Sequence, residues 1–143
     1  MLKNYSLLSA FAVMMMLSGC EIRSVDSDYA SQIDGTYSMT YYEMPDATNS
    51  NPGEGNEVII TRVEDESVSI EVRFSDPNHP IVETEETSIS RDGDDVYTLE
   101  ETFSTADLSG TVDGDELDLL IEYHVEDEDG EEDYVSVRAT LDN

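Results

Sequence analysis

SVSIEVRF, residues 67–74, decides the fold of this 143-residue chain, because its polar and apolar residues alternate strictly. A period of two places the four apolar side chains on one face of a pleated strand and the other four on the opposite face. The same alternation recurs over residues 117–125 and 135–141. No stretch after residue 20 has a helical period. The chain is therefore predicted to be all-β.

Turn signals divide residues 34–143 into short segments. Asp113-Gly114 and Asp92-Gly93 predict tight hairpins, because both central residues of such a turn need a positive φ. Only the first two strands are joined by a long connection, residues 43–56, which holds two Pro and two Gly. The expected strands cover residues 35–43, 57–63, 67–74, 81–90, 95–103, 107–112, 115–124 and 133–141. About eight antiparallel strands in this order hide their edges by closing into an up-and-down barrel or a barrel-like sandwich.

The N-terminal segment has the layout of a signal peptide. Lys3 precedes an apolar run over residues 7–16, followed by Leu17-Ser18-Gly19-Cys20. The run is shorter than the roughly 20 apolar residues that a membrane span needs. Leu-Ser-Gly-Cys resembles the lipobox of bacterial lipoproteins. The resemblance implies cleavage before Cys20, a diacylglyceryl group on its sulfur, and acylation (palmitate, for example) of the new amino terminus.

This resemblance divides the chain into three parts. Residues 1–19 form a signal-peptide helix, residues 20–33 a flexible tether that begins at the lipidated Cys20, and residues 34–143 the folded domain. Cys20 is the only cysteine, so lipidation also accounts for an otherwise odd thiol. In that family an Asp after the cysteine favours the inner membrane. Glu21 therefore favours the outer membrane of a Gram-negative cell, with the periplasmic or surface face left open.

The charge of the chain is strongly negative. It has 35 acidic residues against six Lys and Arg, which gives a formal net charge of −29 at pH 7. Nucleic acid is excluded as a general partner, because binding phosphates needs a basic surface. Three interpretations remain: a solvated acidic surface that keeps the domain soluble, as in proteins of marine or halophilic bacteria, a site for divalent cations such as calcium, or a cationic or protein partner in the envelope.

The start of the first expected strand carries a second resemblance. Asp34-Gly35-Thr36-Tyr37 stands where the lipocalin (calycin) superfamily has Gly-x-Trp, and a long first loop follows. The chain thus resembles the small lipocalin-like domains of bacterial surface lipoproteins, although it has no Trp and no long C-terminal helix. The resemblance implies an eight-stranded barrel, which can be filled by its own side chains or hold one small ligand.

Candidate ligand-binding residues come from two strands. Three share one face of the first strand and three lie on the fifth: Tyr37, Met39, Tyr41, Tyr97, Leu99 and Phe103. Pointing inward, they would give a pocket with apolar walls and a few hydroxyls, the usual composition of a small-ligand site. The alternative is that they only fill the core.

Metal and catalytic sites are not predicted. The acidic run at 126–133 has oxygen ligands for calcium, but Val125 stands where the first ligand of a calcium loop belongs, so a solvated hairpin tip is favoured. Glu122 and His124 share a strand face and could meet at one metal ion, whereas His79 is expected in an exposed turn. No nucleophile elbow, zinc-protease motif or phosphate loop is present. We expect neither an enzyme nor a cofactor.

Two functions are consistent with these features of the sequence. The first is a lipid-anchored envelope protein that binds a small apolar or amphipathic ligand inside the barrel without catalysis. The alternative is a structural or protein-interaction role, with a packed core and no ligand. The interior separates them: an apolar pocket of about several hundred Å³ favours the first, and a filled core favours the second.

Overall fold

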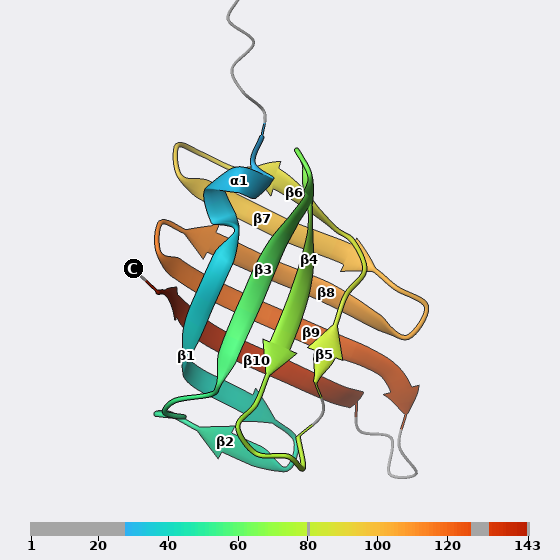
Figure 1. Ribbon diagram of the computed structural model, residues 1–143. Helices are drawn as coiled ribbons and strands as arrows, with labels where there is room; N and C mark the ends of the chain where they lie inside the picture. The colour runs from blue at the N-terminus through green and yellow to red at the C-terminus, as the bar shows by residue number, and fades with distance from the viewer. Residues whose placement is uncertain (1–27, 80, 127–131, 143) are drawn as a thin grey trace, which may run out of the picture.

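Eight strands close into an antiparallel barrel, with one helical turn at one end and two short strands added at its margin (Figure 1). The computed structural model describes residues 28–79, 81–126 and 132–142. The expected signal peptide, Cys20 and the tether up to residue 27 lie outside this range. The elements are α1 (Ala30–Ile33), β1 (Gly35–Met44), β2 (Ala47–Asn49), β3 (Glu57–Glu64), β4 (Ser67–Arg73), β5 (Val82–Glu83), β6 (Thr87–Arg91), β7 (Val96–Thr102), β8 (Ala106–Asp113), β9 (Glu116–Glu126) and β10 (Glu132–Leu141).

The barrel has the simple order that the sequence predicts. Neighbouring strands run β1-β3-β4-β6-β7-β8-β9-β10, and β10 returns to pair with β1. The closing pair aligns Tyr37 with Leu141 and Met39 with Ala139. In Figure 1 the strands β1, β3 and β4 lie at the front, while β7 to β10 cross behind them at a steep angle. The prediction of an eight-stranded antiparallel barrel is confirmed.

The strand expected over 81–90 is instead two strands. β5 pairs with β4 through Val82 and Val72, whereas β6 pairs with the opposite end of β4 through Thr87 and Val68. Thr84, in the break, donates its N–H to the Ile70 carbonyl at 2.9 Å. Its hydroxyl accepts the Ile70 N–H at 2.9 Å, in place of a backbone carbonyl. β6 pairs with β7, whereas β5 pairs only with β4. The sheet is therefore split between β5 and β7.

The two Asp-Gly turns differ from the predicted geometry. Only glycines have a positive φ in the described residues, and Gly114 has φ +58°. In the β8–β9 hairpin only the first central residue, Gly114, has a positive φ, and the second, Asp115, does not. This is the pattern of a type II′ turn, whereas the sequence predicted a turn with a positive φ at both central residues. The Asp92-Gly93 turn lies in a longer connection, between Arg91 and Val96.

The interior of the barrel is filled by apolar side chains. Every barrel strand contributes at least one buried residue. The largest fully buried side chains are Tyr37, Ile33, Ile60, Ile70, Leu99, Leu117 and Leu119. The inward positions on β7 to β10 follow the alternation that predicted these strands.

The tether expected over 20–33 is wrong for residues 28–33. α1 is a single helical turn, and both Ala30 and Ile33 are 0% exposed. Tyr29 packs on Tyr97 with ring centroids 6.0 Å apart, and the Ala30 N–H donates to the Asp65 carbonyl at 3.0 Å. One turn is too short to show a hydrophobic period, so no helical pattern could be recognised in these residues.

Candidate functional site

Four of the six predicted ligand-binding residues belong to the packed core. Tyr37, Met39, Tyr97 and Leu99 are at most 7% exposed. The Tyr37 hydroxyl donates to the Ile33 carbonyl at 2.8 Å, and burial raises the pKa of this phenol to about 12. The four hollows described below are lined by other residues. The predicted residues therefore stabilise the barrel and its contact with α1.

Tyr41 lies outside the barrel, so its predicted place beside Tyr37 and Met39 is wrong. The register of β1 against β10 shifts between Met39 and Tyr41. After this shift the inward-facing side chain is that of Tyr42, which is buried, and no longer that of Tyr41. Such a bulge places two residues of one strand opposite one of the other, and the alternation changes face. The Tyr41 hydroxyl donates to Glu43 at 2.5 Å, and the Arg138 guanidinium lies 5.1 Å from its ring centroid.

Glu43 is held on this outer face by two phenols. Besides Tyr41, the Tyr134 hydroxyl donates to its carboxylate at 2.9 Å. These two hydrogen bonds hold the pKa of Glu43 below its usual range. The carboxylate accepts one hydrogen bond on each oxygen and is stabilised as an anion, which does not favour a role in proton transfer.

An aromatic cluster fills the end of the barrel opposite α1. Tyr42, Phe74 and His79 meet edge to face, with ring centroids 5.1 to 5.7 Å apart. Such tilted arrangements are the favourable ones for aromatic pairs. His79 is thus a partly buried packing residue as well as a turn residue, whereas the sequence predicted only an exposed turn.

Two adjoining hollows lie at this end of the barrel, and His79 of the cluster lines the first. The first, which we call the mouth recess, has a volume of about 530 Å³. The second, the seam slot, lies between β5 and the β7–β8 turn, beside β8 and β9, and has a volume of about 360 Å³. The recess is lined by Met44, Ala47, His79, Ile81, Tyr123 and Tyr134, among others. The slot is lined by Val82, Phe103, Ala106, Leu108, Ile121 and Tyr123, among others. Tyr123 is common to both.

Local structure explains why this end stays open. β2 pairs with Tyr42–Met44 and extends the β1 hairpin past the barrel, while the corner at 76–79 folds back beside it (Figure 1). Ile81 is left 60% exposed, the most exposed large apolar side chain of the described residues. Of the six predicted residues, only Phe103 reaches a hollow. Tyr123 was not predicted from the sequence, because this residue continues the alternation of its strand, as a residue that only fills the core would.

Carboxylates stand at the rims of both hollows. Asp46 and Asp133 line the mouth recess, and Glu83 and Glu85 line the seam slot. All four are exposed. Burial raises the pKa of the Tyr123 phenol, and the nearby charge of Asp133 raises it further. The site combines an apolar floor, tyrosine hydroxyls and a negative rim.

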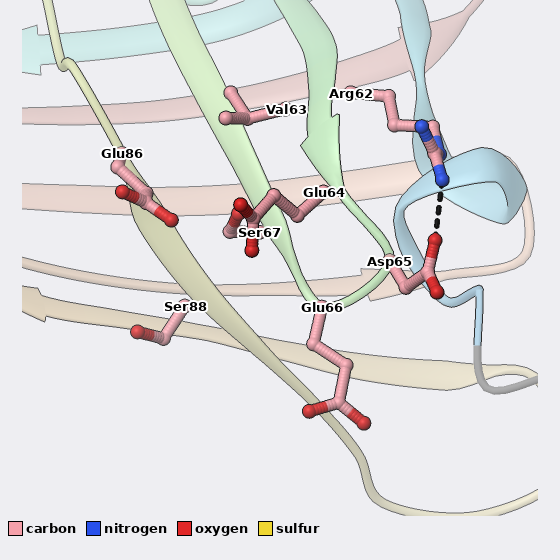
Figure 2. Close-up of a pocket in the computed structure, with 8 residues that line it drawn as sticks. All are labelled: Arg62, Val63, Glu64, Asp65, Glu66, Ser67, Glu86 and Ser88. Atoms are coloured by element: carbon pink, nitrogen blue, oxygen red, sulfur yellow. Dashed lines mark hydrogen bonds and ion pairs between the residues drawn. The ribbon is translucent and has the colours of Figure 1, made fainter.

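A larger hollow near α1 has a different character. It has a volume of about 760 Å³ and lies between the β3–β4 hairpin and the start of β6 (Figure 2). Arg62 pairs with Asp65 there, and the carboxylates of Asp65, Glu66 and Glu86 point in different directions. A fourth hollow, about 350 Å³, lies on the outer face of β8 to β10 around Arg138. The linings of these two hollows are polar, and their side chains do not converge on one point. Neither hollow is therefore favoured as a ligand site.

The structure places the metal candidates apart from these hollows. His124 Nε2 lies 2.8 Å from the Asp107 carboxylate on the neighbouring strand. Within residues 28–79, 81–126 and 132–142, no group of three His, Cys, Asp or Glu side chains is arranged to hold a metal ion. The acidic run at 126–133 falls mostly outside the described residues. No helix in the described part of the chain is long and apolar enough to cross a membrane.

Comparison with known proteins adds a fold neighbour. No family model and no curated protein matches the sequence. The fold is similar to the crystal structure of a Bacteroides fragilis protein described as a "putative outer membrane protein", with a TM-score of 0.59 and 14% identity. The match covers 80% of this chain and 53% of that one, so this chain spans about half of its length. At this identity the similarity shows the fold alone.

Proposed function

We propose that this is a lipid-anchored protein of the bacterial envelope that binds an amphipathic ligand without catalysis, at the open end of its barrel. The observation that carries the proposal is the mouth recess beside a filled interior. Its volume of about 530 Å³ lies within the range of small-ligand sites. We therefore propose that the ligand binds at the rim of the barrel, around Tyr123, and not in its interior, where the sequence predicted it.

The lining of the mouth recess supports an amphipathic ligand. Met44, Ala47 and Ile81 offer apolar contact, while the phenols of Tyr123 and Tyr134 offer polar groups at the edge. A few polar groups on an apolar wall fix the orientation of a bound molecule.

The position of the N-terminal segment supports an anchor at the opposite end. The described chain begins at Asp28, beside α1, whereas the mouth recess lies near β2 and the start of β10 (Figure 1). A tether running from a lipidated Cys20 to Asp28 would therefore attach the domain at the end away from the recess. An envelope location also agrees with the description of the fold neighbour.

Native mass spectrometry of the processed protein tests this function. We expect a small molecule bound at one copy per protein, or binding of the neutral amphiphile octyl glucoside added below its micelle concentration. Ala47→Trp fills the recess and should abolish this binding. Val63→Trp places the same large side chain at an apolar residue that is 44% exposed near α1, and it should leave this binding intact. A wild-type protein that binds neither would rule the proposal out.

The filled interior favours a second candidate, the structural or protein-interaction role. A barrel with a packed core and a charged outer surface is a stable platform that needs no ligand. Crosslinking of the processed protein in intact cells distinguishes the two. A defined protein adduct that Ala47→Trp does not change, together with no bound small molecule, would favour this candidate.

A further inference from the structure

We infer that the ligand of the mouth recess and seam slot is an organic cation with an apolar body, such as an alkyl or aryl amine. The inference rests on the proposed function and names the chemistry of its ligand. The inference is carried by an apolar floor and a negative rim that lie together at one place, in hollows whose linings contain no arginine.

The rim carboxylates are available to a ligand. Asp46 and Asp133 line one hollow, and Glu83 and Glu85 line the other. None of these four carboxylates has a hydrogen bond or an ion pair with another residue in the part of the chain that the structure describes. Glu43 and Asp28, in contrast, are each held by two neighbouring residues. The rim therefore keeps its negative charge without internal compensation.

The arginines of the described residues are all placed elsewhere. Arg62 pairs with Asp28 at 2.9 Å, and Arg73 pairs with Glu57 at 3.2 Å and with Glu71. Arg91 donates to the carbonyls of its own turn, including that of Gly93 at 2.7 Å. Arg138 covers Tyr41. Neither hollow has an arginine in its lining, so an anionic ligand would face the rim carboxylates with no arginine to offset their charge.

The floor of the two hollows suits the other half of such a ligand. Ile81 and Val82 follow one another in the chain but face the recess and the slot, respectively, and Tyr123 lies between these hollows. Burying an alkyl or aromatic body against them removes apolar surface from water. The rings of Tyr123, Tyr134 and Phe103 also attract a cation over their faces. A cationic amphiphile uses both features, whereas a neutral one uses only the floor.

A matched series of eight-carbon probes tests the inference. Octyltrimethylammonium, octyl glucoside and octanoate are titrated into the processed protein by calorimetry, each below its micelle concentration. We expect the cation to bind at least about tenfold more tightly than octanoate, with octyl glucoside between them. The preference should shrink as salt rises, since exposed charges are screened.

A pair of double variants separates the site from the overall charge. Asp46→Asn with Asp133→Asn removes two rim charges, and Asp92→Asn with Asp94→Asn removes two from the exposed β6–β7 turn. We expect only the first pair to reduce cation binding severalfold, with octyl glucoside binding unchanged in both. Equal affinity for all three probes, or an equal loss in both pairs, would overturn the inference but leave the proposed function standing. Binding of no probe would overturn both.

Discussion

The two ends of the barrel are built from the same strands, but one end is covered by a helical turn and the other is left open beside two hollows. At one end the chain itself supplies a cover: α1 buries Ala30 and Ile33 completely, and Tyr29 packs on Tyr97. At the other end an aromatic cluster closes the interior, yet Ile81 remains 60% exposed beside two hollows. The ligand site that we propose lies at the end where two hollows stay open, and the covered end serves as its comparison.

One substitution made at both ends tests this contrast most strongly. Ile33→Ala removes a fully buried side chain from the covered end and should lower the free energy of unfolding by about 2–5 kcal/mol. Ile81→Ala removes an exposed side chain from the open end and should change it by no more than about 0.5 kcal/mol. Urea unfolding measures both values.

The two substitutions control each other, since the residue type and the change are the same. A large loss of stability for Ile81→Ala would mean that the open end is covered in solution, and the ligand site would then have to be abandoned. A small loss for Ile33→Ala would mean that α1 does not cover the barrel.

A smaller effect is expected for the hydroxyl that joins the barrel to its cover. Tyr37→Phe removes the 2.8 Å hydrogen bond to the buried Ile33 carbonyl and should cost about 1 kcal/mol at neutral pH. The pKa of this phenol is about 12 in the folded protein, against about 10 when unfolded. The neutral form is therefore stabilised by folding, and its contribution is complete below pH 10 and lost as pH rises from 10 to 12.

The measurement is stability against pH for the wild type and the variant. The other tyrosines titrate in both proteins, so the difference between the two curves isolates Tyr37. We expect the wild type to lose stability more steeply than Tyr37→Phe between pH 10 and 12. Parallel curves over this interval would show that the phenol is not buried against α1.

The contrast between the ends also marks how far the sequence could predict the molecule. Alternation placed the barrel strands within a few residues, since one face of each strand is buried whatever its partner. It placed Tyr41 on the wrong face, because the bulge after Met39 depends on how β1 meets β10. It missed the split of β5 from β6 because Thr84 uses its side chain in place of the backbone. The site depends on these irregularities, so the strand pattern could predict the core but not the open end.

The smallest expected effect concerns the ion pair that ties the N-terminal segment to β3. Arg62 Nε lies 2.9 Å from the Asp28 carboxylate, and Arg62 also reaches Asp65, whose carbonyl accepts the Ala30 N–H. The hydrogen bond from Arg62 holds the pKa of Asp28 below its usual range. All three side chains are in contact with water, where ion pairs contribute little to global stability. Arg62→Gln should therefore shift the unfolding midpoint less than Tyr37→Phe does.

Its effect should instead be local and sensitive to salt. Hydrogen exchange of the Ala30 and Asp34 amides, which bond to the Asp65 and Ala30 carbonyls, should become faster in Arg62→Gln. The difference from the wild type should fade at high salt, which already screens the pair. Arg138→Gln is the matched control, because that arginine lies 3.8 Å from Asp118 on the far strands and should leave these amides unchanged. Unaltered exchange in Arg62→Gln would mean that the ion pair does not hold the covered end closed.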